Sequence, residues 1–251
     1  EAVEERVGEK LALIDINMAC PARKVITKGE GSALMDDPLL ASAIMKAAVS
    51  RAHVPVTAKI RIGFHTGDRV APAFAEMLED AGAAAVAVHG RSAKQLYTGA
   101  ADWSIIDEVA RAVSIPVIAA GGIADGRGMA AAFALGAEGV QVGTRFLTVD
   151  ECTIADAYKE RVIAAKDADT IVTGRGSGHP VRCLKNKFAR TVRKLEGDVA
   201  ANGDELEAMY VGSLKRAVEG DVDNGTMMAG QSAALVRERA TAAEAIASLV
   251  A

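Results

Sequence analysis

The run Val56-Thr57-Ala58-Lys59-Ile60-Arg61-Ile62 decides the fold class of this chain. It is short, does not alternate cleanly between apolar and polar residues, and ends at Gly63. Such runs are typical of strands that are buried on both faces, as in a parallel sheet. Similar runs cover residues 11–18, 84–89, 115–120 and 139–143. We therefore predict five strands of one parallel sheet.

Helical patterns separate these runs, over residues 38–52, 68–82, 102–113 and 130–135. Alternating strands and helices with short connections indicate an α/β fold. A (β/α)8 TIM-type barrel needs eight such units in roughly 250 residues. We predict that residues 1–149 form strands four to eight of such a barrel, with the first three βα units lying upstream of Glu1.

The pattern changes after Thr148, where the chain reads as a helical C-terminal region over residues 150–251. We expect helices at residues 151–166, 180–196, 205–219, 226–237 and 241–251.

Composition excludes few functions. The 251 residues are 50% hydrophobic and carry 29 basic and 33 acidic side chains, a net charge of -4. This net charge does not by itself indicate binding to nucleic acid or to an acidic membrane, although it is compatible with a local basic patch. The three cysteines have neither metal-ligand spacing nor a disulfide framework, which fits a reducing cytosol. We expect no metal site, no membrane span and no signal peptide.

Polar residues and glycines follow all five predicted strands. Because sites in parallel α/β folds form at the carboxyl ends of strands, these residues are expected to converge. In chain order they are Asn17 and Cys20, then Lys59 and Arg61, then His89 and Arg91, then Ala120-Gly121-Gly122, and finally Gly143-Thr144-Arg145.

The last two strand ends each lead from glycine into a helix. Backbone N–H groups and helix dipoles at such turns bind phosphate, so Gly121-Gly122 and Gly143-Thr144 predict a phosphate cradle. The alternative is that both are tight turns that require glycine.

Three charged or titratable residues leave alternatives open. A buried ammonium needs a partner, so Lys59 would contact either a ligand oxygen or the carboxylate of Asp15. His89 would face a ligand or lie satisfied in the core. His179, in a glycine-rich turn, would be a ligand contact or part of a hinge.

Cys20 is the candidate for chemistry, because it precedes Pro21 on the loop after the first strand. A thiol is mostly protonated at neutral pH and can donate a proton. The alternative is a small buried hydrophobe, which is the usual role of free cysteine. Cys152 and Cys183 fit that alternative.

The first half resembles the tRNA-dihydrouridine synthases, in residues 1 to about 118. The matching motifs are Asp15–Ala22, Lys28–Met35, Val56–Gly63 and His89–Ser92 with Tyr97–Trp103. That family is an FMN-dependent (β/α) barrel that reduces uridine in tRNA. The resemblance implies that Cys20 protonates the uridine ring, while Lys59 and His89 hold the flavin with Arg91 nearby.

The second half resembles the nitronate monooxygenases and the flavin-dependent enoyl-ACP reductases. Ile115–Leu147 and Gly178–Lys187 carry this likeness, and Gly220–Gln231 matches the reductases in particular. Their catalytic histidine in a Gly-Gly-His turn is absent, and His89-Gly90-Arg91 occupies that strand end. The dihydrouridine-synthase strand ends Asn-Gly-Asp and Gly-Arg-Gly are likewise replaced here, by Ala120-Gly121-Gly122 and Gly143-Thr144-Arg145.

Both resemblances imply FMN, with Ala120, Gly121, Gly122, Gly143 and Thr144 at its phosphate. The leading hypothesis is a cytoplasmic enzyme that reduces tRNA, with NAD(P)H as reductant. The alternatives are oxidation of a nitroalkane, reduction of an acyl thioester, or an inactive barrel fragment or fusion. Lys185, Lys187, Arg190, Arg193 and Lys194 form a basic helix face that would contact tRNA or simply be solvated. An oligomer is compatible with the open strand edges.

Overall fold

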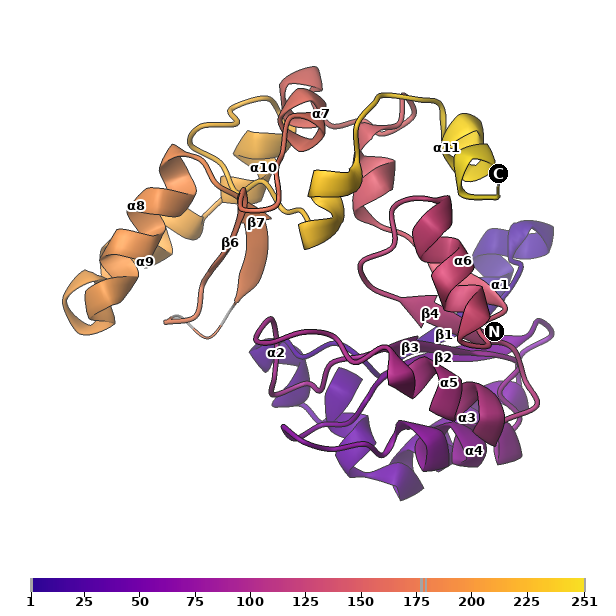
Figure 1. Ribbon diagram of the computed structural model, residues 1–251. Helices are drawn as coiled ribbons and strands as arrows, with labels where there is room; N and C mark the ends of the chain where they lie inside the picture. The colour runs from indigo at the N-terminus through magenta and orange to yellow at the C-terminus, as the bar shows by residue number, and fades with distance from the viewer. Residues whose placement is uncertain (1, 177, 179, 251) are drawn as a thin grey trace. The chain divides into compact units, whose positions relative to one another are not determined.

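The computed structural model describes residues 2–176, 178 and 180–250 (Figure 1). His179 therefore lies outside the described residues. By internal packing the chain divides into two compact units. The first comprises Glu1–Gly121 with Ala130–Gln141, and the second comprises Gly122–Met129 with Val142–Ala251. The domain boundary expected between residues 149 and 150 stays a prediction.

The first unit is a five-stranded parallel sheet with the order β1-β2-β3-β4-β5. Its strands are β1 (Ile14–Asn17), β2 (Val56–Arg61), β3 (Val86–His89), β4 (Val117–Ala120) and β5 (Gly139–Gln141). All five predicted strands are confirmed, and the α/β class with them. The sheet is open at β1 and β5.

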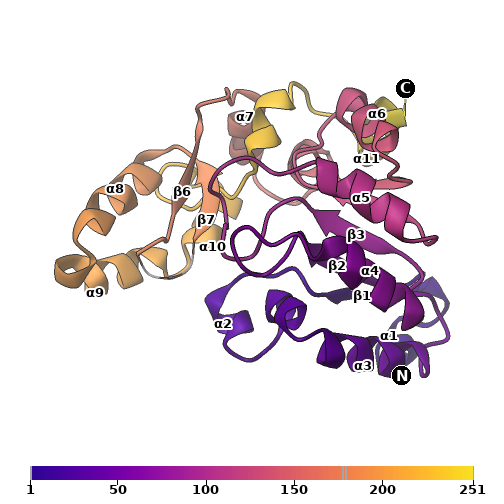
Figure 2. The same cartoon turned by 60° about the horizontal axis from the view of Figure 1, so that its bottom comes forward.

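Helices connect these strands, and α3, α4 and α5 lie on one side of the sheet (Figures 1 and 2). In chain order the helices are α1 (Ala2–Val7), η1 (Gly8–Lys10), α2 (Arg23–Ile26), η2 (Gly31–Asp36), α3 (Pro38–Val49), α4 (Ala71–Asp80), α5 (Ser104–Ala112) and α6 (Gly126–Ala134). The start of α3 is fixed by Pro38 at its first turn and by the Asp37 carboxylate, which accepts a hydrogen bond from the Leu40 N–H at 3.0 Å.

The core of the first unit lies between the sheet and these helices. Ala58 and Ile60 of β2 and Val86 and Val88 of β3 are all 0% exposed. Their side chains point to one face of the sheet, because alternate residues of a strand face opposite sides. Lys59, Arg61 and His89 therefore belong to the other face.

The second unit contains η3 (Thr144–Thr148), α7 (Asp156–Ile163), β6 (Thr170–Thr173), β7 (Val181–Leu184), α8 (Lys187–Leu195), η4 (Glu196–Asp198), α9 (Val199–Tyr210), α10 (Ser213–Val218), η5 (Gln231–Leu235) and α11 (Ala242–Val250). Two apolar clusters form its core. One surrounds Tyr158 and Met227, and the other joins Phe188, Val192 and Leu206.

Three expectations for the C-terminal region are wrong in detail. The helix expected from residue 180 begins only at Lys187, because Val181–Leu184 pairs antiparallel with β6. The helix expected over residues 226–237 is reduced to the short 3-10 helix η5, because residues 226–230 are not helical and lie beside β7, where the Leu184 N–H donates to the Met227 carbonyl at 2.9 Å. The helix expected over residues 205–219 is broken at Gly212, whose φ is +67°.

Candidate active site

The register of the sheet places the predicted strand-end residues in two adjacent rows. Asn17 of β1 lies opposite Lys59 of β2, and Arg61 lies opposite His89 of β3. His89 in turn lies opposite Ala120 of β4. The rows are two residues apart along β2, so they share one face of the sheet. The convergence expected from the sequence is therefore present within the first unit.

The loop that carries Cys20 is held by its neighbours on both sides of the thiol. The side-chain oxygen of Asn17 accepts hydrogen bonds from the backbone N–H groups of Ala19 and Cys20, both at 3.0 Å. The N–H and the hydroxyl of Ser32 both donate to the Cys20 carbonyl, again at 3.0 Å. Gly31 permits this approach, since a Cβ there would lie 2.7 Å from that carbonyl oxygen.

Arg61 joins this loop to the loop after β3. Its Nε donates to the Ala19 carbonyl at 2.6 Å, and its Nη1 donates to the Ser92 carbonyl at 3.2 Å and the Arg91 carbonyl at 3.4 Å. Burial lowers the pKa of Arg61, and within the described part of the chain no carboxylate pairs with it. The sequence predicts Arg61 at a strand end but indicates no role for it. Its position two residues after Lys59, on the same face, was the available signal.

Lys59 is a half-buried cation whose Nζ has neither a hydrogen bond nor an ion pair with the residues that the structure describes. Burial, and then the charge of Arg61, lower the pKa of Lys59 to about 8. Asp15 raises that pKa only as the smallest contribution, and its carboxylate accepts a hydrogen bond from the Thr57 hydroxyl at 2.7 Å instead. The Lys59–Asp15 ion pair is therefore not formed.

His89 is neutral, with a defined tautomer. Burial lowers the pKa of His89 to about 3, and the charges of Arg61, Lys59 and Arg91 act in the same direction. Its Nδ1 accepts a hydrogen bond from the Arg91 N–H at 3.2 Å, so Nε2 carries the proton. That Nε2 faces the end of β4, because a Cβ added to Gly121 would lie 2.9 Å from it.

Arg91 completes the group of cations. Its Nη2 donates to the Gly99 carbonyl at 3.2 Å, while its Nε is buried without a hydrogen-bond partner among the described residues. Burial lowers the pKa of Arg91. Lys59, Arg61 and Arg91 thus surround a neutral imidazole, which suits an electron-rich or anionic ligand.

The predicted site residues are divided between the two units. Cys20, Lys59, His89, Arg91, Ala120 and Gly121 belong to the first unit, and Gly122, Gly143 and Thr144 belong to the second.

The three glycines of the predicted phosphate cradle differ in their backbone conformation. Gly121 and Gly122 have φ values of +105° and +87°, so the turn itself requires glycine there. Gly143 has a φ of −116° and open space around its Cα, so its backbone does not require glycine. The Thr144 hydroxyl accepts a hydrogen bond from the Gly230 N–H at 3.0 Å and keeps its own proton to donate.

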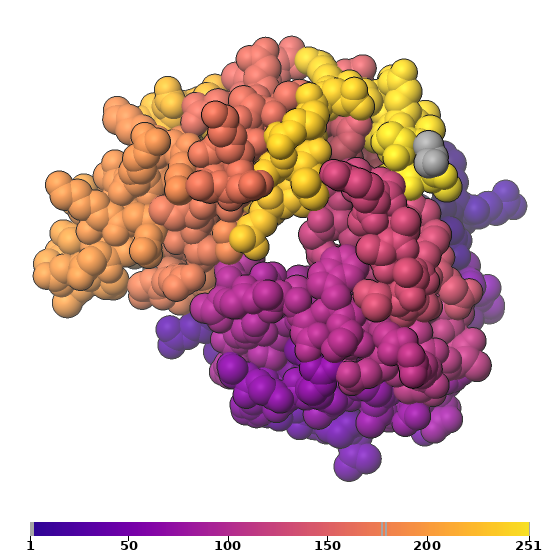
Figure 3. All heavy atoms as spheres, in the orientation of Figure 1, coloured from indigo at the N-terminus to yellow at the C-terminus, as the bar shows by residue number. Residues whose placement is uncertain are grey.

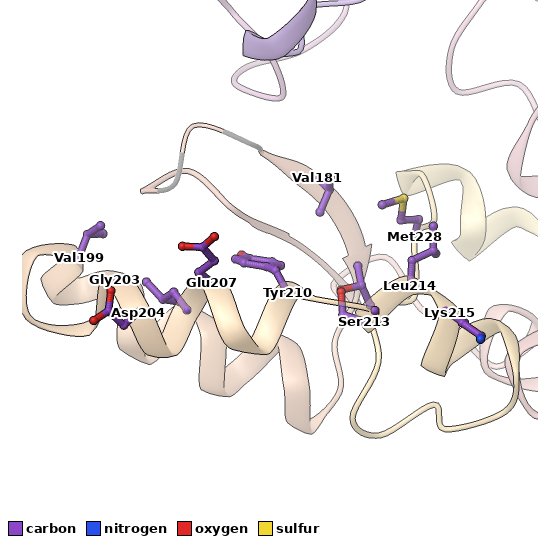
Figure 4. Close-up of a pocket in the computed structure, with 13 residues that line it drawn as sticks. Val181, Val199, Gly203, Asp204, Glu207, Tyr210, Ser213, Leu214, Lys215 and Met228 are labelled. Atoms are coloured by element: carbon purple, nitrogen blue, oxygen red, sulfur yellow. The ribbon is translucent and has the colours of Figure 1, made fainter.

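A cavity of about 790 Å³ lies in the second unit, between β7, α9 and α10 (Figure 4). Val199, Leu206, Tyr210, Leu214 and Met228 give it an apolar lining, and none of the predicted site residues lines it.

The thiol of Cys183 lies in the second unit. Cys183 is completely buried, and burial raises the pKa of its thiol, as expected of a small core residue. In the described ranges, no helix combines the length and the hydropathy that crossing a membrane requires.

The family model for dihydrouridine synthase matches residues 1–202. The chain belongs to the dihydrouridine synthase family. Over 123 residues it is 46% identical to tRNA-dihydrouridine synthase B of Xanthomonas axonopodis pv. citri, covering 49% of this chain and 37% of that protein. Over 144 residues it is 41% identical to a probable tRNA-dihydrouridine synthase of Rickettsia conorii, and the match covers 57% of this chain and 44% of that protein. The chain thus spans less than half the length of these curated relatives.

Solved structures extend the likeness into the second unit. FabK from Thermotoga maritima is 34% identical, with a TM-score of 0.70 over 99% of this chain and 70% of that chain. Nitroalkane oxidase from Streptomyces ansochromogenes is 26% identical, with a TM-score of 0.63, and the match covers 99% of this chain and 65% of that chain. Both resemblances found in the sequence are therefore confirmed. Membership of the dihydrouridine synthase family also confirms the barrel class, of which five consecutive strands are present here.

Proposed function

We propose that this chain is part of an FMN-dependent oxidoreductase that reduces uridine to dihydrouridine in tRNA, with Cys20 as the proton donor. The observation that carries the proposal is the held loop of Cys20. Asn17, Ser32 and Arg61 fix the backbone on both sides of the thiol, and Arg61 ties it to the strand end that carries His89. A proton donor must be held at the reacting atom, and this loop meets that requirement.

The residues of the first unit fit a flavin. Bound FMN supplies a hydride, which NAD(P)H would replenish. Lys59 has a cationic Nζ without a partner among the described residues, and the buried Nε of Arg91 also lacks one there. The neutral His89 offers Nε2–H as a donor. We assign these three side chains to the ring system, whose oxygens and nitrogens accept hydrogen bonds and whose reduced form is electron-rich.

We assign the phosphate of FMN to the ends of β4 and β5. Ala120, Gly121, Gly122 and Gly143 would offer backbone N–H groups, and Thr144 would offer its hydroxyl proton. Residues 1–149 would form the flavin-binding part of the barrel and residues 150–251 its C-terminal region.

Cys20 then completes a two-electron reduction. A hydride adds to C6 of the uridine ring, the C5=C6 bond becomes single, and the Cys20 thiol gives its proton to C5. The resulting thiolate regains a proton from solvent. Because tRNA is the substrate, we place the enzyme in the cytoplasm.

Substitution of Cys20 by alanine tests this proposal. The chain is purified and titrated with FMN, and dihydrouridine is then measured in an unmodified tRNA transcript in the presence of NADPH. Cys20→Ala is expected to bind FMN like the native chain and to lose dihydrouridine formation, since a positioned acid contributes about 10²- to 10⁴-fold. Equal dihydrouridine formation by both chains would refute the role of Cys20.

The likeness to nitroalkane oxidase over 99% of the chain supports a second candidate, in which the substrate is a nitroalkane or, as the resemblance to the enoyl-ACP reductases implies, an acyl thioester. The sequence argues against it, because His89-Gly90-Arg91 replaces the Gly-Gly-His turn of those enzymes. Turnover of crotonyl-CoA or nitroethane by the FMN-loaded chain, without tRNA, would favour this candidate over the first.

A further inference from the structure

The charges of residues 185–210 are separated along the chain in an unusual way. Residues 185–195 contain five cations and no acid, namely Lys185, Lys187, Arg190, Arg193 and Lys194. Residues 196–210 contain five acids and no cation, namely Glu196, Asp198, Asp204, Glu205 and Glu207. The first run forms α8 and the second forms α9, side by side in the second unit (Figures 1 and 2). A chain of net charge -4 therefore carries a concentrated basic surface on one helix.

The basic face of α8, defined as Lys187, Arg190, Arg193 and Lys194, is exposed along the whole helix. These residues recur every three or four positions, so they form a stripe about 10 Å long at a rise of about 1.5 Å per residue. The helix lies at the surface of the molecule, within the orange segment of Figure 3.

Most of this charge is not neutralised within the described part of the chain. Arg193 pairs with Glu196 at 3.4 Å, and this is the one ion pair found there for the basic face. The other three cations have no carboxylate partner among the described residues. Some exposed cations elsewhere do have partners, such as Arg111 with Asp107 at 2.9 Å and Lys215 with Glu219 at 3.7 Å. A stripe of uncompensated cations is the electrostatic pattern that binds a polyanion.

The packing of α8 decides between two polyanions, an RNA and an acidic membrane. A helix that lies on a membrane inserts its apolar face into the lipid. Here the apolar face is already occupied, because Phe188 and Val192 are 4% and 0% exposed and pack with Leu206 of α9. The exposed face of α8 presents only cations and Thr191. This leaves charge without an apolar anchor, which suits the phosphates of a nucleic acid.

We propose that the basic face of α8 binds the sugar-phosphate backbone of the tRNA substrate. This inference rests on the proposed function and names a surface that would position its substrate. The acids of α9, including the exposed Asp204 and Glu207, repel phosphate beside it and so confine the RNA to the α8 side. Contacts of this kind fix orientation and carry no sequence information, so base selection stays with the active site.

The salt dependence of binding gives the expected size of the effect. Each neutralised phosphate contributes about 0.7 to 0.9 to the slope of log K against log salt concentration. Removing three cations should therefore lower that slope by roughly 2 to 3. The variant Lys187→Gln/Arg190→Gln/Lys194→Gln leaves the Arg193–Glu196 pair in place.

A matched control removes the same charge elsewhere. Arg111→Gln/Arg127→Gln/Lys215→Gln changes three side chains that are 79%, 84% and 77% exposed. Binding of an unmodified tRNA transcript to the native chain and to each variant is measured at several salt concentrations, without FMN or NADPH, and circular dichroism verifies folding. The α8 variant should lose 2 to 3 from the slope and the control variant less than about 1.

An equal loss in both variants, or no loss in either, would overturn the proposal. Binding of the native chain to phosphatidylserine vesicles but not to tRNA would also overturn it. If the α8 variant alone loses binding while no chain forms dihydrouridine, the proposed activity fails and the RNA-binding surface stands.

Discussion

Replacement of Arg61 by methionine tests whether this side chain holds the Cys20 loop. The substitution keeps an apolar stem of similar length and removes the donors to the carbonyls of Ala19, Ser92 and Arg91. The bonds at 2.6 Å and 3.2 Å are charge-assisted, and each such bond contributes about 1.5 to 3 kcal/mol. The burial that lowers the pKa of Arg61 shows that its charge is partly desolvated, so methionine regains part of this energy. We expect a net loss of about 2 kcal/mol in unfolding free energy.

Hydrogen exchange at the loop measures this loss where it should act. The N–H groups of Ala19, Cys20 and Ser32 are all hydrogen-bonded in the loop, so each exchanges only when the loop opens. A loss of about 2 kcal/mol corresponds to roughly 30-fold faster exchange in a peptide covering residues 17–32. The two-stranded sheet of the second unit is the internal reference, and its exchange should not change.

Arg61→Lys is the matched variant for this experiment. It keeps the charge but lacks the planar fork that reaches two carbonyls, so it should recover only part of the protection. Exchange at residues 17–32 that stays at the native rate in Arg61→Met, together with an unchanged urea midpoint, would show that Arg61 does not hold the loop.

Gly121→Ala should destabilise the fold by about 1 to 3 kcal/mol, because φ is +105° and the new Cβ would lie 2.8 Å from the His89 ring, whereas Gly143→Ala should be nearly neutral in the same thermal melts. FMN affinity should fall as the pH rises above about 8, because Lys59 then loses its charge, and fluorescence titrations of Lys59→Met should show weaker binding without this decline. The folded-state pKa of His89 is about 3, below its ordinary value of 6.5, so protonation favours the unfolded chain between these values. Stability should fall by up to about 1.4 kcal/mol per pH unit as the pH drops through that window, and urea unfolding of His89→Gln should show a shallower decline.

The sequence predicts the first unit well because its central strands β2, β3 and β4 are mostly buried, whereas the edge strands β1 and β5 are partly exposed. Unbroken apolar runs leave little choice of structure, and the strand ends then follow from Gly63, Gly90 and Gly121. The convergence of Lys59 and His89 could also be predicted, because parallel strands align their carboxyl ends.

The contacts of the site could not be predicted in this way. The hydrogen bonds of Arg61 end on backbone carbonyls, and which carbonyls lie within its reach cannot be seen in the sequence. The choice of Thr57 over Lys59 as the partner of Asp15 depends on the register between β1 and β2. In the second unit, the local pattern of Val181–Leu184 indicates helix, whereas the segment pairs with β6, whose Thr173 lies eight residues upstream of Val181. Tertiary pairing overrides local pattern in such segments.

Cys20 is proposed to give the proton in the reduction of uridine beside a bound flavin. The most direct measurement is anaerobic and limited to a single turnover, with FMN on the chain reduced chemically and then mixed with unmodified tRNA. Oxidation of the flavin is followed by its absorbance, and dihydrouridine is counted in the recovered tRNA. The native chain should oxidise its flavin and form one dihydrouridine per flavin, and Cys20→Ala should do so at least about 100-fold more slowly. Equal rates in the two chains, with equal dihydrouridine, would show that Cys20 is not the proton donor.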